Sequence, residues 1–298
     1  MTSLGKFQPP DEFDPQFYRS EYINLSALDD TGARDHYYSL GVLEGHSGNA
    51  IKTRQDFISL IPTAASVLEI GPYFSPLMRG GNVRYFDVLN REQMKSRAVS
   101  QGVADANPPE IDYVSPNGDM SIIKDKFDFA ISSYCIEHQT DLIKHLNDVK
   151  KVLSPEGCYF ILAPDKRYCH DHFMAESTIA GVIDAHHSKR STHPLRAVIE
   201  HVGLSAHNDQ FRHWRGDHGV LQENYVERTK QAISIFERAN GTYVDVHSWY
   251  FTPSSMRTII SALNALDYCD LKLIRCYETR KFHNDFWVIL QRDALSSG

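Results

Sequence analysis

Residues 66–71, SVLEIG, form a short apolar stretch that ends in a glycine, and they set the pattern for the first half of the chain. Further stretches of the same kind follow: VRYFDV at 83–88, IDYVS at 111–115, FDFAISS at 127–133 and CYFILAP at 158–164. Short apolar runs bounded by turn residues are typical of buried strands. The sequence therefore predicts five strands before residue 165.

Helical segments are predicted between these strands. One is expected at 52–61, a polar one at 91–102, and a third within 137–153, where apolar residues recur at helical spacing. Strands that alternate with helices indicate an α/β, doubly wound, mostly parallel sheet with helices on both faces. The link from 71 to 83 is short, so we expect a turn or a one-turn helix there.

The alternation stops after residue 165. Helices are predicted at 176–186, 194–203 and 222–239, between loops rich in His, Asp, Arg and Trp. A capped helix at 252–266 then precedes two strands, CDLKLIRCYET and NDFWVILQRD, expected as an antiparallel hairpin at the sheet edge. We therefore expect three parts: an N-terminal helical extension over 1–50, a main domain over 51–298, and an inserted helical lid at about 166–250.

Composition narrows the function. The chain has 298 residues and a net charge of -7, with 31 Lys and Arg against 38 Asp and Glu. That balance argues against general nucleic-acid binding, which needs excess positive charge to neutralise phosphates. No apolar run reaches the roughly 18 residues of a membrane span, and residues 1–14 lack the apolar core of a signal peptide. The five Cys contain no C-x-x-C pair. A soluble, cytoplasmic protein is expected, with no indication of its oligomeric state.

Ligands of doubly wound sheets bind at the carboxyl ends of the strands. In order and spacing, the motifs found there, SVLEIGP, GDM, FDFAISSYCIEH and GCYFILAPDKR, resemble those of class I S-adenosylmethionine-dependent methyltransferases, over roughly 50–165 and 250–292. The resemblance implies a Rossmann-like fold with seven strands and S-adenosylmethionine as cofactor. It also implies a set of cofactor-binding residues: Glu69, Gly71, Pro72, Asp87, Val88, Asp119, Met120, Ser133, Tyr134 and His138.

Individual roles follow from that resemblance. Asp87 lies 16 residues beyond Gly71, near the spacing expected of a ribose ligand. Asp119 and Met120 would flank the adenine, and Ser133 and Tyr134 would line the methionine end. The first loop, GPYFSP, departs from the common G-x-G-x-G pattern, and it is similar to the EIGP-type loop of methyltransferases in bacterial sugar and polysaccharide pathways.

The N-terminal segment carries a second resemblance. FDPQFYRSEYINL followed by HYYSLGVLEGHSGN is similar to a short helical module attached to bacterial polysaccharide-assembly enzymes, with His46 in place of the usual Arg. This resemblance implies a glycan context.

Histidine is concentrated in the insertion, where nine of the 15 His lie between 170 and 218. One imidazole of near-neutral pKa would suit proton removal from a sugar hydroxyl. The candidate catalytic residues are His138, Asp165, His170, His172 and His218. Candidate substrate contacts are Lys166, Arg167, His186, His187, Arg212, His213 and Trp214. The spacing lacks H-E-x-x-H, so no metal ligands are predicted, and a divalent metal is an alternative that we do not favour.

The sequence thus predicts methyl transfer from S-adenosylmethionine to a hydroxyl of a sugar, nucleotide-sugar or glycan, with a His or Asp general base. Two alternatives stay open: a methyltransferase for nitrogen or for a small metabolite, and a non-catalytic module that binds cofactor or glycan in polysaccharide assembly. A nicotinamide-dependent reductase is disfavoured because the first loop has a single glycine.

Overall fold

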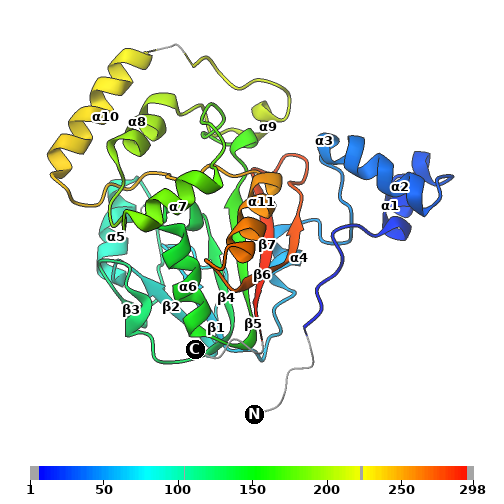
Figure 1. Cartoon of the computed structure of the whole chain (residues 1–298), viewed down its shortest axis with the longest axis horizontal. Coiled ribbons are helices and arrows are strands. Elements are labelled where there is room, and N and C mark those ends of the chain that lie inside the picture. The colour runs from blue at the N-terminus through cyan, green and yellow to red at the C-terminus, as the bar shows by residue number, and fades with distance from the viewer. Residues whose placement is uncertain (1–6, 104, 222–223, 294–298) are drawn as a thin grey trace.

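A computed structural model describes residues 7–103, 105–221 and 224–293, and its centre is a seven-stranded sheet (Figure 1). The strands are β1 (Val67–Ile70), β2 (Val83–Asp87), β3 (Tyr113–Val114), β4 (Phe127–Ser133), β5 (Leu153–Pro164), β6 (Leu271–Tyr277) and β7 (Asp285–Arg292). Their order across the sheet is β3-β2-β1-β4-β5-β7-β6. β7 runs antiparallel to both of its neighbours, while the pairs among β1 to β5 are all parallel. The predicted doubly wound, mostly parallel sheet is confirmed.

Helices cover both faces of this sheet. One face packs against α6 (Leu142–Val152) and α11 (Pro253–Ala265), whose apolar stripes join the strands in the larger core. The other face packs against α4 (Arg54–Ile58) in a second core. The polar helix α5 (Arg91–Ser100) follows β2. Because both faces are covered, the strands read as nearly continuous apolar runs rather than as an alternating pattern.

The segment between β5 and α11 carries most of the remaining helices. These are η5 (Lys166–Tyr168), α7 (Ile179–His187), α8 (Leu195–Leu204), α9 (Gln210–His213) and α10 (Tyr225–Ala239). α8 and α10 pack together around a small core of their own, and with α9 they lie beyond the carboxyl ends of the strands (Figure 1). α9 was not predicted, and the predicted start of α10 at 222–223 lies outside the described residues.

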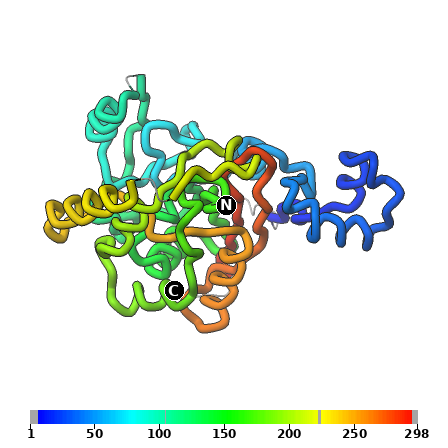
Figure 2. Tube along the Cα trace, turned by 90° about the horizontal axis from the view of Figure 1, so that it is seen from above, coloured from blue at the N-terminus to red at the C-terminus, as the bar shows by residue number. Residues whose placement is uncertain are grey.

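The N-terminal segment forms a small helical unit at one side of the molecule, with α10 at the opposite side (Figure 2). It contains α1 (Pro15–Glu21), η1 (Ile23–Leu25), α2 (Asp30–His36), a π-helical turn η2 (Tyr37–Gly41) and α3 (Val42–Glu44). Phe13, Tyr18, Ala33 and Tyr37 form its buried core. The aromatic residues noted in the sequence thus pack mainly against one another.

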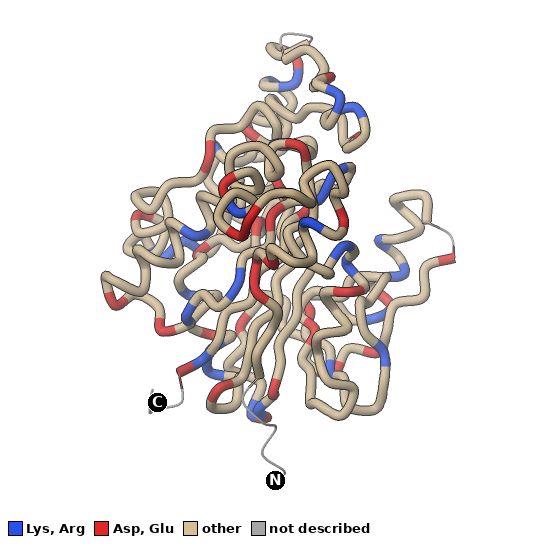
Figure 3. Tube along the Cα trace, turned by 90° about the vertical axis from the view of Figure 1, so that its right-hand side faces the viewer, with Lys and Arg blue, Asp and Glu red and all other residues tan. Residues whose placement is uncertain are grey.

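Three local features matter for the site. Residues 71–82 form turns without a helix, as the short link predicted. A 3-10 turn, η4 (Ile136–His138), follows β4, and α6 begins only after Asp141, whose side chain caps it. Acidic and basic residues are interspersed along the chain (Figure 3). None of the helices in the described residues is long and apolar enough to cross a membrane.

Candidate active site

The loop after β1 meets the loop after β4 at Gly71. This glycine has a φ of +69°, and a Cβ there would lie 3.3 Å from the Cys135 sulfur. A side chain is therefore disfavoured both by conformation and by space. In the order 3-2-1-4-5 the chain reverses its direction of winding between β1 and β4, which is where open α/β sheets bind their ligands. The structure places Gly71 and Pro72 at that point.

Glu69 fixes the course of this loop. Its buried carboxylate accepts hydrogen bonds from the backbone N–H groups of Leu77 at 2.7 Å and Met78 at 3.1 Å. Burial raises the pKa of Glu69 to about 7, against the opposing effect of these two donors. The residue therefore has a structural role of its own, and its expected contact with the cofactor stays a prediction.

Asp87 ends β2 and faces the same loop. Its Oδ1 accepts the Leu89 N–H at 2.9 Å. Burial raises the pKa of Asp87, while the backbone N–H groups of Leu89, Val88 and Tyr73 and the charge of Arg97 oppose the rise. The N–H of Gly71 donates to the carbonyl of Phe86 at 2.9 Å, which places the end of β2 beside the Gly71 loop. A carboxylate in this position fits the paired hydroxyls of a ribose.

The other expected cofactor residues have partners within the protein. Asp119 caps η3 (Met120–Ile122), where its carboxylate accepts bonds from the N–H and the hydroxyl of Ser121, both at 2.9 Å. Met120 is buried in the larger core. Ser133 ends β4, and the hydroxyl of Tyr134 lies 2.6 Å from Arg54 Nη2 and 2.8 Å from Asn284 Oδ1. Contacts of these four residues with a cofactor stay predictions.

A cluster of imidazoles and carboxylates lies directly beyond Cys135. We call it the His247 cluster, and it consists of Glu137, His138, His170, Asp171, His201, Asp245 and His247. His247 is at the centre: its ring lies 4.6 Å from that of His138, 4.7 Å from that of His170 and 5.0 Å from that of His201, between centroids. η4, the turn after η5, α8 and the segment before α11 each contribute to it.

Carboxylates orient the imidazoles of this cluster. Nδ1 of His247 hydrogen-bonds Asp171 Oδ2 at 2.7 Å, and Nδ1 of His138 lies 3.0 Å from Asp245 Oδ1. Asp245 also pairs with Arg97, whose guanidinium lies 5.4 Å from the centre of the Tyr73 ring. The cluster is therefore connected to the Gly71 loop and adjoins the predicted cofactor half of the site.

Burial sets the charge states in the cluster. It lowers the pKa of His170, and burial together with the neighbouring His247 lowers that of His201 to about 3, so both imidazoles are neutral at pH 7. Burial also acts on Asp171 and His247, but their hydrogen bond outweighs it, so the pKa of Asp171 falls and that of His247 rises. The hydrogen bond between Asp171 and His247 thus favours the charged form of both groups.

Sequence reasoning found only part of this cluster. His138 and His170 were expected at the site, and Glu137 was noted only as the neighbour of His138 at the end of β4. Asp245 and His247 lie outside the His-rich region at 170–218 and belong to no motif. Asp171 could have been found, since it lies between two expected residues in His170-Asp171-His172.

The expected roles of Asp165 as a catalytic residue and Arg167 as a substrate contact need correction. Asp165 is fully buried, and both of its oxygens accept bonds from Arg167, at 2.9 Å for Nε to Oδ1 and 2.6 Å for Nη2 to Oδ2. Thr279 donates a further bond to Oδ2 at 2.6 Å. A carboxylate so enclosed cannot act as a base on a substrate, and the fork of Arg167 is occupied. Both residues instead fix the end of β5.

His186 and His187 lie away from the His247 cluster. They lie at the end of α7, where His186 Nδ1 is 2.9 Å from Asp141 Oδ2 and His187 Nε2 is 2.6 Å from the hydroxyl of Tyr268. These contacts hold α7 against the start of α6 and the end of α11. Neither residue joins the His247 cluster, and their expected role in substrate binding stays a prediction.

A second group of imidazoles gathers around α9. The rings of His172 and His218 stack at 3.7 Å, and His213 Nδ1 lies 2.9 Å from His218 Nδ1. Lys166 donates to the carbonyl of His172 at 3.0 Å. The structure thus brings His172, His213 and His218 together, separately from His138.

Two expected substrate contacts in this region, Arg212 and Trp214, have partners within the protein, and their contact with a substrate stays a prediction. Arg212 pairs with Asp217 at 2.8 Å on an exposed turn. Trp214 stacks on Tyr168 with centroids 3.9 Å apart, and its indole N–H donates to the carbonyl of His283 at 2.7 Å. Each of the two rings thus covers one face of the other.

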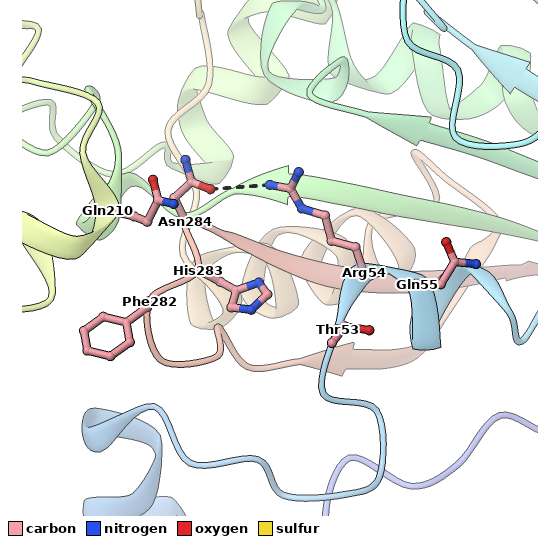
Figure 4. Close-up of a pocket in the computed structure, with 7 residues that line it drawn as sticks. All are labelled: Thr53, Arg54, Gln55, Gln210, Phe282, His283 and Asn284. Carbon is pink, nitrogen blue, oxygen red and sulfur yellow. Dashed lines mark hydrogen bonds between the residues drawn. The ribbon is translucent and has the colours of Figure 1, made fainter.

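Two hollows open near these elements. One of about 450 Å³ is lined by Arg54, Gln210 and Asn284 among others, with Arg54 held by the buried Asp285 at 2.8 Å (Figure 4). The other, of about 360 Å³, lies between α7, α8 and residues 248–250. The second adjoins the His247 cluster, because Ser248 lines it directly after His247 and hydrogen-bonds His193 at 2.6 Å.

Comparisons with known proteins agree with this picture. Residues 70–161 match the family model described as a methyltransferase domain. No curated protein matches the chain. Among solved structures, a SAM-dependent methyltransferase from Aquifex aeolicus is similar at 12% identity, covering 94% of this chain and 98% of that one, with a TM-score of 0.39.

Two further structures are similar. Magnesium protoporphyrin IX methyltransferase from Synechocystis PCC 6803, with bound SAH, has 11% identity over 89% of this chain and 100% of that one, with a TM-score of 0.35. The CcbJ methyltransferase from Streptomyces caelestis has 12% identity and a TM-score of 0.26; the match covers 41% of this chain and only about half, 54%, of that one.

The domain match and the sheet order confirm the expected methyltransferase fold. The match over residues 70–161 also supports the expected enzyme class and S-adenosylmethionine as the methyl donor. The match includes Gly71, Asp87 and the start of the His247 cluster at Glu137 and His138. It does not reach the insertion, where the acceptor side is expected.

Proposed function

We propose that this S-adenosylmethionine-dependent methyltransferase methylates a hydroxyl group of a sugar, nucleotide-sugar or glycan. The observation that carries the proposal is the position of the His247 cluster, next to Cys135 and therefore next to the Gly71 loop. A hydroxyl is a poor nucleophile that must lose a proton on methylation, and several imidazoles at this place can accept one. The glycan-type resemblance of the N-terminal segment supports the substrate class.

The residues near the Gly71 loop would bind the donor. Gly71 and Pro72 leave the backbone open to the methionine part of the donor, and Asp87 would accept hydrogen bonds from its ribose hydroxyls. The bound donor supplies a methyl group and leaves as S-adenosylhomocysteine. His138 faces the donor side of the cluster.

His170 is the proposed general base. Its Nε2 has no hydrogen-bond partner within the described residues, and burial keeps the ring neutral. Asp171 Oδ1 lies 3.4 Å from this nitrogen, where its charge would stabilise the imidazolium formed when the proton arrives. The proton of the acceptor hydroxyl would therefore pass to His170 Nε2.

Donor binding tests the first half of the proposal. Asp87→Asn should weaken the binding of S-adenosylhomocysteine about 10-fold or more, because hydrogen bonds to a charged acceptor are lost. Asp35→Asn, the same change on the exposed side of α2, should leave the dissociation constant unchanged in titration calorimetry. No measurable binding by the wild type would overturn the assignment of the donor.

Product analysis tests the second half. With methyl-labelled donor and a panel of nucleotide sugars and glycan extracts, the label should appear as an O-methyl ether in NMR spectra. His170→Gln should lower kcat about 10²-fold or more without weakening donor binding, whereas His187→Gln should leave kcat unchanged. A labelled nitrogen, with turnover unaffected by His170→Gln, would favour the N-methyltransferase. Donor binding without turnover on any acceptor would favour the non-catalytic module.

A further inference from the structure

Glu137 is a buried carboxylate that no hydrogen bond within the described residues stabilises. Its side chain is fully buried, and neither Oε1 nor Oε2 has a hydrogen-bond partner in the part of the chain that the structure describes. A buried carboxylate without partners costs several kcal/mol, so such a group is normally paired or bound to a metal ion. Glu137 therefore calls for a ligand at its oxygens.

Two imidazole nitrogens face these oxygens. Nε2 of His138 lies 4.0 Å and Nε2 of His247 lies 3.9 Å from Glu137 Oε1. Two ligand atoms that each lie about 2.1 Å from one ion are about 3.4 Å apart when the site is tetrahedral. They are about 4.2 Å apart when they lie on opposite sides of the ion. The observed separations fall between these values, and the donor atoms of all three residues lie within 4.8 Å of one another. A tetrahedral ion bound by all three donors would draw them closer together than they lie in this structure.

Carboxylates lie at the opposite nitrogens of the two rings. Asp171 binds Nδ1 of His247 at 2.7 Å, which directs Nε2 of this ring to Glu137. This carboxylate–imidazole arrangement is the usual support of histidines that bind metals. Asp245 lies 3.0 Å from Nδ1 of His138, but no hydrogen bond joins the two groups in the described residues.

We propose that Glu137, His138 and His247 form a binding site for one divalent transition-metal ion such as Zn²⁺. Two imidazoles and one carboxylate suit such an ion and leave coordination positions open. Asp171 is a positioning residue. Sequence reasoning expected no metal because it searched for a local spacing, whereas these three ligands come from η4 and from a segment more than 100 residues later.

A role of the ion in the reaction rests on the proposed function. An acceptor hydroxyl bound at an open position would become more acidic, and His170 would then receive its proton. The site itself does not depend on this role, because metal binding is measured without donor or acceptor.

Metal binding to the full chain tests the proposal. After treatment with a chelator, titration with Zn²⁺ should show one tight ion per chain, and Co²⁺ should give visible absorption bands of a low-coordinate site. Glu137→Gln should abolish this site, and Asp171→Asn should weaken it about 10- to 100-fold. His213→Gln is the matched control, since it breaks the other imidazole group, His172, His213 and His218, and should leave the tight site intact.

Several outcomes would overturn the site. They are the absence of a tight ion in the wild type, its retention by Glu137→Gln, and its loss in His213→Gln. If Glu137→Gln does not fold, X-ray absorption of the Zn²⁺-loaded wild type decides. Two imidazoles with oxygen ligands support the site, whereas three imidazoles point to another group, either His172, His213 and His218 or His170, His201 and His247, and overturn it. If Glu137→Gln loses the ion but still binds S-adenosylhomocysteine, the metal site is tested separately from the donor site.

Discussion

At the scale of single residues, burial decides which side chains can react. His145 lies on α6 with its Nε2 2.9 Å from the hydroxyl of Tyr159, and burial lowers its pKa to about 4. The folded state therefore keeps His145 neutral in a pH range where the unfolded chain, with an ordinary value near 6.5, is protonated.

The predicted consequence is loss of stability in acid. The contribution of His145 should be fully present above pH 6.5 and fall by up to about 3 kcal/mol as the pH decreases toward 4. Urea unfolding of the wild type and of His145→Gln at several pH values measures it. The difference between the two free energies should change in favour of the variant on acidification. Parallel curves would show that His145 does not titrate in this way.

Contacts with neighbouring side chains explain why the expected catalytic role of Asp165 was wrong while His170 stays a candidate. Asp165 follows a strand end, as a catalytic carboxylate would, but Arg167 two residues later encloses it. His170 follows the same strand and stays unpaired at Nε2 within the described ranges. The sequence cannot separate these two cases, because each depends on the direction of a neighbouring side chain.

At the scale of elements, caps fix where helices begin. Thr252 starts α11 by accepting the Ser255 N–H at 3.2 Å, and its hydroxyl also donates to Glu176 Oε1 at 2.6 Å. α11 covers the sheet, and Glu176 lies in the insertion just before α7. This one residue thus joins the insertion to the main domain.

We predict that Thr252→Val costs about 1–2 kcal/mol of unfolding free energy, because it removes the cap and leaves Glu176 without this bond. Thr258→Val, the same change at an exposed position in the middle of α11, is the control and should cost less than about 0.5 kcal/mol. Chemical denaturation measures both. Equal losses would contradict the role of the cap.

Elements were predicted well where periodicity carries the signal. β1, β2 and β4, and the helices α6, α8 and α11, lie within a few residues of their predicted positions. β5 is longer than predicted, since Leu153 pairs with Phe127 before the turn at Pro155. α9 was missed because four residues capped by Asp209 show no apolar period.

At the scale of the whole molecule, the N-terminal segment is bound along the last strands. Glu12 accepts the Cys276 N–H at 2.6 Å and pairs with Arg257 at 2.9 Å, while Tyr277 donates to the carbonyl of Pro10 at 2.7 Å. Residues 10–12 thus cover β6, the edge of the sheet, where unpaired backbone groups would otherwise be exposed.

We predict that Glu12→Gln lowers the unfolding free energy by about 1–2 kcal/mol, because an ionic contact and a charge-assisted bond to backbone are lost together. Glu21→Gln removes the surface pair with Lys52 and should cost less than about 0.5 kcal/mol. Thermal unfolding compares the two variants. A Tm for Glu12→Gln no lower than that for Glu21→Gln would show that this contact does not hold the segment.

The sequence by itself determined the sheet and the edge of it at which the donor is expected to bind. Strand periods, the glycine at 71 and the carboxylate at 87 are local signals, and a parallel sheet brings successive strand ends to one edge. The tertiary structure decided which imidazoles and carboxylates gather beyond that edge. Glu137, His138 and His247 come together only because the chain returns across that edge after the insertion, and which imidazoles remain unpaired depends on contacts between residues far apart in sequence.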